Sequence, residues 1–544
     1  MVKDPQNKYI PFVPLKMTQR SWPDNQLTHP PIWCSVDLRD GNQALVDPMN
    51  VEEKLELFHT LVDIGVKEIE VGFPSASETE FEFLRALIDG GHIPDDVTIQ
   101  VLVQAREHLI RRTFEAIDGA KHVIFHFYNS TSTLQRKVVF HTGVDGVKQI
   151  AVDAANLIRE LSQSALDSGM DLRYEYSPES FMGTEMDAAV EICQAVLEAL
   201  QATPERKVIL NLPTTVENCM PNYFADEIEY FISKLPSRDC AIISLHPHND
   251  RGEGVATAEL GQLAGAERVE ATLFGNGERT GNVDMVTLAL NLYTQGVDPG
   301  LDFSDINKIR DVYERVTKMK IGERQPYVGE LVFTAFSGSH QDAINKGTQY
   351  MEQSGSALWE VPYLPIDPAD VGRQYEPHSF GFDLPKAMHP EFGHIVQVET
   401  DRVGKELKPD AIYALFKEHY IDAVKPYELV RHSFAEFTDE EGHSHVTFAG
   451  TLRHKDTVFQ VQGSGNGPID AFFNAIHGQK MDRFTFVDYK EHAIQAGSDS
   501  LAVAYIQLKD SQGKDVFGVG ISHNINLAPL KGILSAINRS VTQL

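Results

Sequence analysis

The sequence predicts a (β/α)8 barrel, followed by helical linker subdomains and a C-terminal α+β domain built from a tandem repeat. Short apolar runs alternate with amphipathic helical stretches over residues 32–304, and polar residues follow nearly every run. Two similar strand–strand–helix patterns then occupy the end of the chain. The expected division is an N-terminal extension (1–31), the barrel (32–304), the linker subdomains (305–424) and the α+β domain (425–544).

The first apolar run follows Pro31 and is short and partly β-branched, as in a buried strand. The expected strands are Ile32–Leu38, Val66–Gly72, Val97–Val103, His122–Tyr128, Asp171–Tyr176, Lys207–Leu212, Ala241–Leu245 and Arg268–Leu273. The expected helices are Glu52–Ile64, Glu78–Asp89, His108–Ile117, Asp145–Ser168, Asp187–Leu200, Tyr223–Lys234 and Gly254–Gly265. The alternative is a doubly wound open sheet, but no Gly-rich phosphate turn follows the first strand.

The chain changes character after the barrel. Ile306–Val316 and Asp410–His419 have helical patterns, with a loop-rich stretch between them. In the last domain, the expected strands are His445–Leu452, Val458–Val461, Leu501–Leu508 and Val516–Val519, and the expected helices are Pro468–His477 and Leu527–Asn538. Two such units in tandem predict an α+β domain with internal pseudo-symmetry.

Composition restricts the possible partners. The 544 residues carry a formal net charge of -30, which disfavours nucleic acid and anionic membranes because both attract basic surfaces. The four cysteines are far apart and form no disulfide framework or zinc spacing, so we expect reduced thiols in a cytoplasmic protein. No apolar run approaches the roughly 18 residues of a membrane span, and residues 1–31 lack the apolar core of a signal peptide.

The polar strand ends predict a site, because a barrel builds its active site at the carboxyl ends of its strands. His246 and His248 alternate by two, so on a strand they share one face. Together with Asp40 they offer two imidazoles and a carboxylate, which suit Zn²⁺, Mn²⁺ or Fe²⁺ with positions left open for substrate. The alternative is that these histidines lie in an ordinary surface loop. Asn282 is either a further oxygen ligand or a turn residue after Gly281.

Other polar strand-end residues have two interpretations each. Arg39 presents a fork suited to a carboxylate or enolate oxygen, or it forms a salt bridge with a barrel carboxylate such as Glu70. Glu179 either takes part in acid/base chemistry or pairs with an arginine. Thr215 can hydrogen-bond a substrate carboxylate.

Four motifs carry a resemblance to a known family. Asp37–Gln43 reads Asp-Leu-Arg-Asp-Gly-Asn-Gln, and His246–Gly252 reads His-Pro-His-Asn-Asp-Arg-Gly. Leu273–Asn282 and Thr334–Ile344 supply the other two motifs. From about residue 32 to its end, the chain resembles the long-chain branch of the 2-isopropylmalate synthases, within the metal-dependent barrel superfamily of Claisen-type synthases and lyases.

The resemblance implies condensation of acetyl-CoA with 3-methyl-2-oxobutanoate, a divalent metal (Mg²⁺, Mn²⁺ or Zn²⁺), a homodimer and feedback inhibition by leucine. It implies that Arg39 polarises the keto-acid carbonyl, that Glu179 lines the same pocket, and that His340 is the base that reaches the partner subunit's site. The residues implied to hold the keto acid are His126 and Thr215, and those implied to hold the metal are Asp40, His246, His248 and Asn282.

The resemblance also implies that residues 425–544 bind leucine and regulate the barrel. Val487, Ala502 and Tyr505 are expected to line an apolar crevice. The Gly-rich turn Gly463–Asp470 either offers backbone N–H groups to a carboxylate at a helix N-terminus or only shapes the repeat. The chain departs from its relatives after Gly372–Glu376, where a basic Gly-rich stretch is missing or replaced and His378–Pro385 follows almost directly.

Two other functions compete with this one. A citramalate or homocitrate synthase would use the same metal and base with a different keto acid, although the repeat-built last domain disfavours homocitrate synthase. A catalytically silent amino-acid sensor is the alternative from another class. The presence of Arg39, Asp40, His246 and His248 argues against a sensor.

Overall fold

The computed structural model describes residues 1, 3–335, 337–377, 382, 384–403, 407, 409–438, 444–477, 481, 483–494 and 500–542. The chain divides into two compact units, Met1–Tyr375 and Glu376–Leu544, which are described separately. None of the helices among the described residues is long and apolar enough to cross a membrane.

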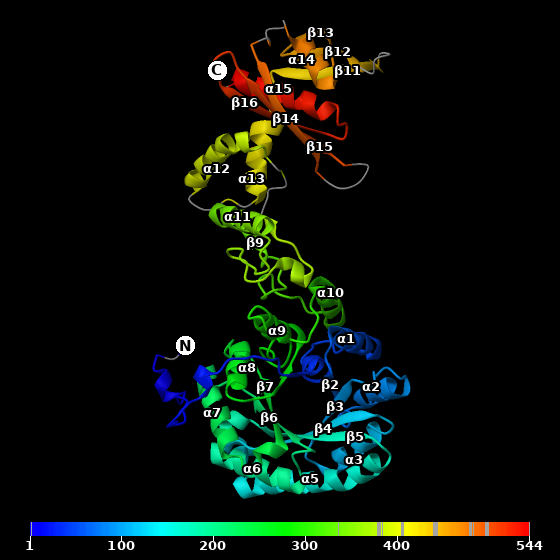
Figure 1. Cartoon of the computed structure of the whole chain (residues 1–544), viewed down its shortest axis with the longest axis vertical. Coiled ribbons are helices and arrows are strands. Elements are labelled where there is room, and N and C mark those ends of the chain that lie inside the picture. The colour runs from blue at the N-terminus through cyan, green and yellow to red at the C-terminus, as the bar shows by residue number, and fades with distance from the viewer. Residues whose placement is uncertain are drawn as a thin grey trace. The chain divides into compact units, whose positions relative to one another are not determined.

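The first unit contains a closed barrel in which eight parallel strands pair in chain order and β8 pairs back onto β1 (Figure 1). The predicted barrel is therefore confirmed. Its strands are β1 (Ile32–Ser35), β2 (Glu68–Gly72), β3 (Thr98–Gln104), β4 (His122–Ser130), β5 (Asp171–Glu179), β6 (Val208–Thr214), β7 (Ala241–Pro247) and β8 (Arg268–Ala271).

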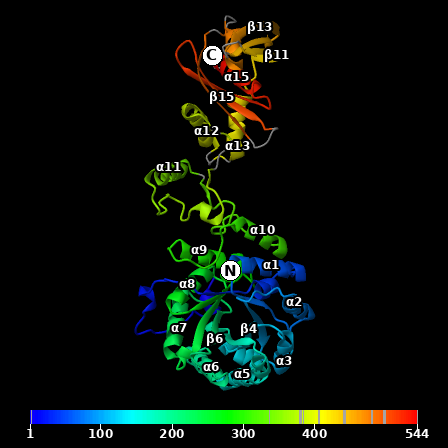
Figure 2. The same ribbon diagram turned by 45° about the vertical axis from the view of Figure 1, so that its right-hand side comes forward.

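A ring of helices covers the outside of the barrel, as Figure 2 shows for α1, α2, α3 and α5 to α8. The first helix illustrates how local sequence sets the bounds: Asn50 and Glu53 form a capping box at its start, and Gly65 ends it in a left-handed conformation. The helices are α1 (Val51–Ile64), α2 (Glu78–Asp89), α3 (Glu107–Ala116), α4 (Thr133–Gln135), α5 (Val144–Asp167), α6 (Met186–Ala199), α7 (Pro221–Lys234), α8 (Gly254–Leu263) and α9 (Met285–Tyr293).

The end of the first strand differs from the prediction. β1 stops at Ser35, and Asp37–Gly41 form a π-helical turn instead of continuing the strand to Leu38. The carbonyl oxygen of Val36 accepts hydrogen bonds from the backbone N–H groups of Arg39, Asp40 and Gly41 at 3.3, 2.9 and 3.1 Å. Because these bonds curl the backbone, Asp37, Arg39 and Asp40 do not alternate across a strand.

The segments flanking the barrel belong to the same unit. The N-terminal extension is held to α7 by Arg20, whose guanidinium donates to both carboxylate oxygens of Asp226 at 2.6 and 2.7 Å. After the barrel come α10 (Ile306–Thr317), which the sequence predicted, and α11 (Gly338–Ser354), which lies in the predicted helical linker subdomains but whose bounds were not predicted. The Gln325 side chain donates to Asp284 Oδ2 at 2.8 Å, which joins this region to the start of α9.

The second unit contains α12 (His389–Val403), α13 (Pro409–Phe416) and two three-stranded antiparallel sheets, each carrying one helix (Figure 1). The sequence predicted only two strands for each sheet, which is wrong: β11 and β14 were missed. Both are edge strands whose described side chains are mostly exposed, so the apolar alternation that reveals a strand is weak. The elements are β11 (Tyr427–Thr438), β12 (Ser444–His454), β13 (Thr457–Gly465), α14 (Pro468–Ile476), β14 (Thr485–Ala493), β15 (Ala502–Lys509), β16 (Asp515–Ser522) and α15 (Leu527–Thr542).

Glycines at equivalent places in the two repeats let each helix approach its sheet closely. A Cβ atom on Gly463 would lie 2.3 Å from the Ala475 backbone nitrogen, and one on Gly518 would lie 2.2 Å from that of Ala536. Asp470 Oδ2 also accepts a hydrogen bond from the Asn466 backbone at 3.0 Å, so a carboxylate of the chain itself lies at the start of α14. These contacts favour the structural interpretation of the Gly-rich turn.

Candidate active site

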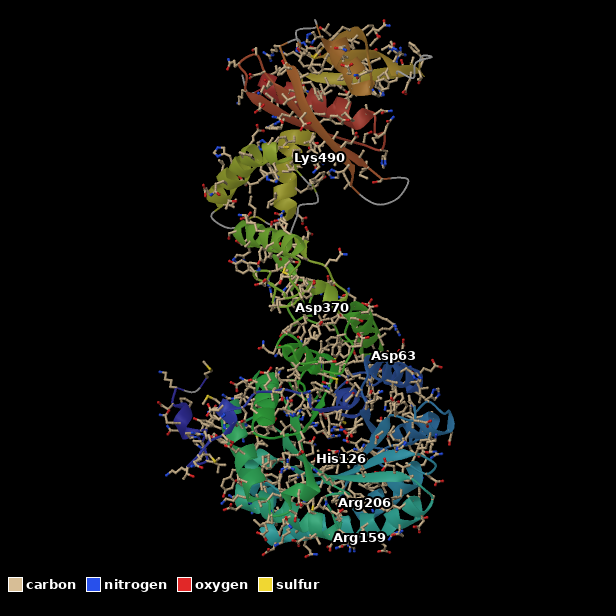
Figure 3. All side chains as sticks on the ribbon, in the orientation of Figure 1. Asp63, His126, Arg159, Arg206, Asp370 and Lys490 are labelled. Carbon is tan, nitrogen blue, oxygen red and sulfur yellow. The ribbon has the colours of Figure 1, made fainter. Side chains whose placement is uncertain are left out.

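A cavity of about 770 Å³ opens at the carboxyl ends of the barrel strands. Figure 3 shows His126, one of its lining residues, inside the barrel, whereas Arg159 lies on the outer helix α5. Most of the site residues that the sequence proposed come together here, although they lie on five different strand ends. The predicted site residues that line the cavity are Arg39, Asp40, His126, Glu179, Thr215, His246 and His248.

Asp40, His246 and His248 form a buried cluster whose potential ligand atoms all lie within 4.8 Å of one another. Asp40 comes from the π-helical turn after β1, and His246 lies at the end of β7. His248 follows β7 and pairs with Asn282 through an isolated antiparallel bridge. The Nε2 atoms of the two histidines lie 3.6 and 3.8 Å from Asp40 Oδ2, so three donors converge on one position.

Buried hydrogen bonds fix the orientation of His246. Glu270 Oε2 accepts a hydrogen bond from His246 Nδ1 at 2.7 Å. Since a carboxylate can only accept, the proton resides on Nδ1, and Nε2 is left facing Asp40. A carboxylate behind a metal-binding histidine is the usual arrangement in metal sites, because it holds the ring and raises its basicity.

The residues of this cluster fit a divalent cation. Within the described part of the chain, Asn282 Oδ1 and His248 Nδ1 are buried side-chain atoms without a hydrogen-bond partner. Asn282 Nδ2 donates to Asp40 Oδ2 at 2.8 Å, which brings the Asn282 amide beside the cluster. Buried polar atoms are costly when unpaired, and two imidazoles, a carboxylate and an amide oxygen are a suitable donor set for a divalent metal.

The charge states of the cluster follow from its neighbours. Burial opposes the ionisation of Asp40, but the Arg39 guanidinium and the neighbouring His246 hold the pKa of the Asp40 carboxyl well below its usual range. Burial lowers the pKa of His246, but the neighbouring Asp40 and Glu270 carboxylates outweigh burial and raise that pKa to about 9. Burial and the neighbouring His246 lower the pKa of His248 to about 3.

These pKa values predict how pH affects metal binding. At pH 7.5 His246 carries a proton that a bound cation must displace, whereas His248 and Asp40 carry none. Binding of Mn²⁺ should therefore release about one proton, and its affinity should fall by about tenfold for each pH unit below 9. Calorimetry in buffers of different ionisation enthalpy measures the protons released; release of none at pH 7.5 would contradict this assignment.

Arg39 forms the salt bridge that was one of its two interpretations, and it also lines the cavity. Its Nε donates to Glu70 Oε1 at 2.5 Å and its Nη1 to Asp40 Oδ1 at 2.8 Å, while the side chain still lines the cavity. The salt bridge with Glu70 is therefore real. It holds a permanent cation beside the candidate metal cluster, where it can stabilise negative charge that develops on a substrate oxygen.

The other proposed pocket residues are held by neighbouring polar groups. His126 is buried, with Nδ1 2.8 Å from Glu70 Oε2 and Nε2 2.8 Å from Ser177 Oγ. Thr215 Oγ1 accepts a hydrogen bond from the Ser180 backbone at 2.8 Å, and Glu179 accepts one from the Ser130 hydroxyl. All three side chains face the cavity from β4, β5 and the loop after β6.

His340 is not brought to this cavity by its own chain. It is exposed on α11, and its ring stacks on that of Tyr363 with centroids 4.0 Å apart. It is not among the residues that line the cavity.

Of the three residues proposed for the crevice in the second unit, one lines a cavity. Ala502 contributes to a cavity of about 510 Å³. Val487 is 43% exposed and Tyr505 is 2% exposed, and neither is among the lining residues. The lining residues are Tyr489, Glu491, His492, Ala493, Ser500, Ala502, His523 and Ile525. The replaced stretch His378–Pro385 lies largely outside the described residues.

Sequence reasoning missed the polar residues inside the barrel. Gln100 on β3 and Glu270 on β8 are fully buried and contact the residues that surround the cluster. Ser177 and Asn211 also line the cavity. A charged or amide side chain inside an otherwise apolar strand could have revealed these residues. Such a side chain is rarely buried without a partner, so its presence indicates a buried polar network.

A closed barrel with a histidine–histidine–aspartate cluster at the carboxyl ends of its strands is typical of metal-dependent barrel enzymes. The family model described as HMGL-like matches residues 30–313, and the second unit is matched over residues 406–541 by the LeuA allosteric (dimerisation) domain. Between them, residues 330–378 match the post-catalytic domain-like model of alpha-isopropylmalate synthase.

Relatives that match the chain over its full length identify the family within this class of metal-dependent barrel enzymes. The chain is 52% identical to a 2-isopropylmalate synthase of Clostridium acetobutylicum, covering 98% of this chain and 99% of the relative. It is 51% identical to that of Pseudomonas putida (100% and 99%) and 50% identical to that of Brucella suis (98% and 99%). The chain belongs to the 2-isopropylmalate synthase family.

Proposed function

We propose that this chain is an acyltransferase that condenses acetyl-CoA with 3-methyl-2-oxobutanoate to give 2-isopropylmalate and CoA, the first committed step of leucine biosynthesis. The cluster of Asp40, His246 and His248 beside Arg39, in the cavity of a chain of this family, is the observation that supports it most. Its free cysteines suit a cytoplasmic enzyme. We assign catalysis to residues 32–304 and regulation to residues 425–544.

The side chains of the cavity have separate roles in this reaction. Asp40, His246, His248 and Asn282 would hold a divalent cation (Mg²⁺, Mn²⁺ or Zn²⁺), which supplies Lewis-acid polarisation of the keto acid through its carbonyl and carboxylate oxygens. His126 and Thr215 bind and orient the keto acid, and Glu179 completes the polar wall of the pocket. Arg39 stabilises the negative charge that develops on the carbonyl oxygen as the new carbon–carbon bond forms.

The acetyl group needs a base, because its methyl proton is only weakly acidic. His340 takes this proton, and the resulting enolate attacks the keto carbon. Water then cleaves the thioester and releases CoA. Because His340 does not line the cavity of its own chain, we propose that it acts in the cavity of a second copy, which makes the active enzyme a homodimer.

The substrate is tested by measuring thiol release from acetyl-CoA with a panel of 2-oxo acids and Mn²⁺. The highest kcat/KM is expected with 3-methyl-2-oxobutanoate. A higher value with pyruvate would identify a citramalate synthase, and one with 2-oxoglutarate a homocitrate synthase. No thiol release with any acid would favour a silent sensor.

We further propose that leucine binds in the second unit, in the cavity that Ala502 lines, and inhibits the barrel. The cavity has apolar side chains such as Ala493 and Ile525 beside polar ones such as Glu491 and Ser500. A small amino acid needs both, since its side chain is apolar and its amino and carboxylate groups are charged.

Filling this cavity is expected to abolish inhibition. Ala502→Phe adds a ring where leucine would lie, so leucine should no longer bind in calorimetry or inhibit thiol release, while the rate without leucine should stay near that of the unaltered chain. Val487→Phe is the matched control, since Val487 is exposed on the neighbouring strand outside the cavity. Undiminished leucine binding by Ala502→Phe would place the leucine site elsewhere.

A further inference from the structure

Gln100 lies behind the candidate active site and contacts none of the space in which substrates would bind. It is a β3 residue whose side chain is fully buried, and it is not among the residues that line the cavity. A buried amide needs partners for its two N–H donors and its oxygen. Gln100 has all of them: two carboxylates and a guanidinium inside the barrel, with the Cys34 thiol as a further donor to its oxygen at 3.8 Å.

Arg268 fixes which way the Gln100 amide points. Arg268 is the first residue of β8 and is wholly buried, and its Nη2 donates to Gln100 Oε1 at 2.6 Å. A guanidinium can only donate, so the amide oxygen must face it. Other donors of the same guanidinium hold Glu68 at 2.7 Å and Ser244 at 2.8 Å, so Arg268 is itself held from several sides.

The amide nitrogen of Gln100 consequently lies between two carboxylates. It donates to Glu70 Oε2 at 2.7 Å and to Glu270 Oε1 at 2.7 Å. Both carboxylates are buried, and an oxygen of one lies within 4.8 Å of an oxygen of the other. The two N–H groups keep the carboxylates close together despite their mutual repulsion, because hydrogen bonds to ionised groups are strong inside a protein.

Each of these carboxylates holds a group that the proposed reaction uses. Glu70 accepts hydrogen bonds from Arg39 and His126 through its two oxygens. Glu270 accepts one from His246 Nδ1 and so directs the other ring nitrogen to the metal position. The Gln100 amide donates to both carboxylates and so joins the two sides behind the cavity.

Glu70, His126 and Glu270 also place their potential metal-ligand atoms within 4.8 Å of one another. Gln100 Nε2 lies 2.7 Å from both carboxylates and 3.3 Å from His126 Nδ1. An amide nitrogen with hydrogens therefore occupies the position that a second cation would need, so this cluster is a hydrogen-bonded support.

We infer that Gln100 is a positioning residue that aligns the metal ligand His246 with the carbonyl-polarising Arg39. This inference rests on the proposed roles of Arg39 and His246. Its test is the replacement Gln100→Met, which keeps the length of the side chain and removes its donors. Gln262→Met is the matched control, because Gln262 is a buried glutamine of α8 that bonds only the Ala258 backbone among its described contacts.

Gln100→Met is expected to weaken binding of Mn²⁺ by about 10- to 100-fold in calorimetry and to lower kcat by a similar factor at saturating Mn²⁺. The KM for the keto acid should change much less, and Gln262→Met should change neither metal affinity nor kcat. Gln100→Glu is the second variant, used if Gln100→Met fails to fold: it keeps an oxygen that accepts the hydrogen bond from Arg268, but it removes the donors to Glu70 and Glu270.

A folded Gln100→Met or Gln100→Glu protein with the Mn²⁺ affinity and kcat of the control would overturn the inference. A lower unfolding temperature with unchanged affinity and kcat would also overturn it, since a purely structural role predicts that result. The proposed reaction and the positioning role of Gln100 can be refuted independently of each other. If the unaltered chain releases no thiol with any keto acid, the proposed reaction fails, while the Mn²⁺ titrations still decide the role of Gln100.

Discussion

His248→Ala is expected to abolish Mn²⁺-dependent thiol release while the barrel stays folded. The variant removes one of three converging donors, and no other described side chain is placed to replace it in the cluster. The fold should survive because His248 follows β7 in a loop, and its backbone N–H, which alanine retains, makes the bond to Thr214 Oγ1 at 2.9 Å. Removing the His248 imidazole breaks no hydrogen bond at Nδ1, because this atom has no partner among the described residues.

Calorimetry measures the Mn²⁺ affinity of His248→Ala, and thermal unfolding measures whether its barrel stays folded. Tight Mn²⁺ binding should be lost, and the unfolding temperature without metal should stay within a few degrees of that of the unaltered chain. The control is His108→Ala, which removes an exposed histidine on α3. Full turnover by His248→Ala after chelator treatment would refute the assignment of the metal ligands.

His340→Ala is expected to lower kcat by about 100- to 10,000-fold, because a positioned base contributes that much to removal of a weakly acidic proton. The KM for the keto acid should change little, since His340 does not line the cavity that would bind it. The control is Tyr350→Ala, which removes another exposed ring from α11. An unchanged kcat would make His340 a bystander and leave the base unassigned.

Mixing experiments decide whether His340 acts in the second copy. Chains with His248→Ala and chains with His340→Ala should each be inactive alone. After the two are unfolded and refolded together, mixed dimers would hold one site that combines an intact metal cluster with an intact His340, so activity should return. Continued inactivity of a folded mixed dimer would show that His340 does not act across the interface.

The sequence by itself determined the barrel and most of its site. Strand and helix periodicities are local, and helix signals such as the Asn50 capping box act within one turn, so the eight strands were expected near their observed positions. The meeting of Asp40, His246 and His248 also followed, because a closed parallel barrel brings the carboxyl ends of its strands together.

The tertiary structure decided what depends on contacts between distant residues. The π-helical turn after β1, the edge strands β11 and β14, and the exclusion of Val487 and Tyr505 from the second cavity have no periodic signal in the chain. The support formed by Gln100, Glu70 and Glu270 joins residues that are 30 and 170 positions apart. Hydrogen bonds require specific distances and directions in space, and spacing along a sequence does not set them.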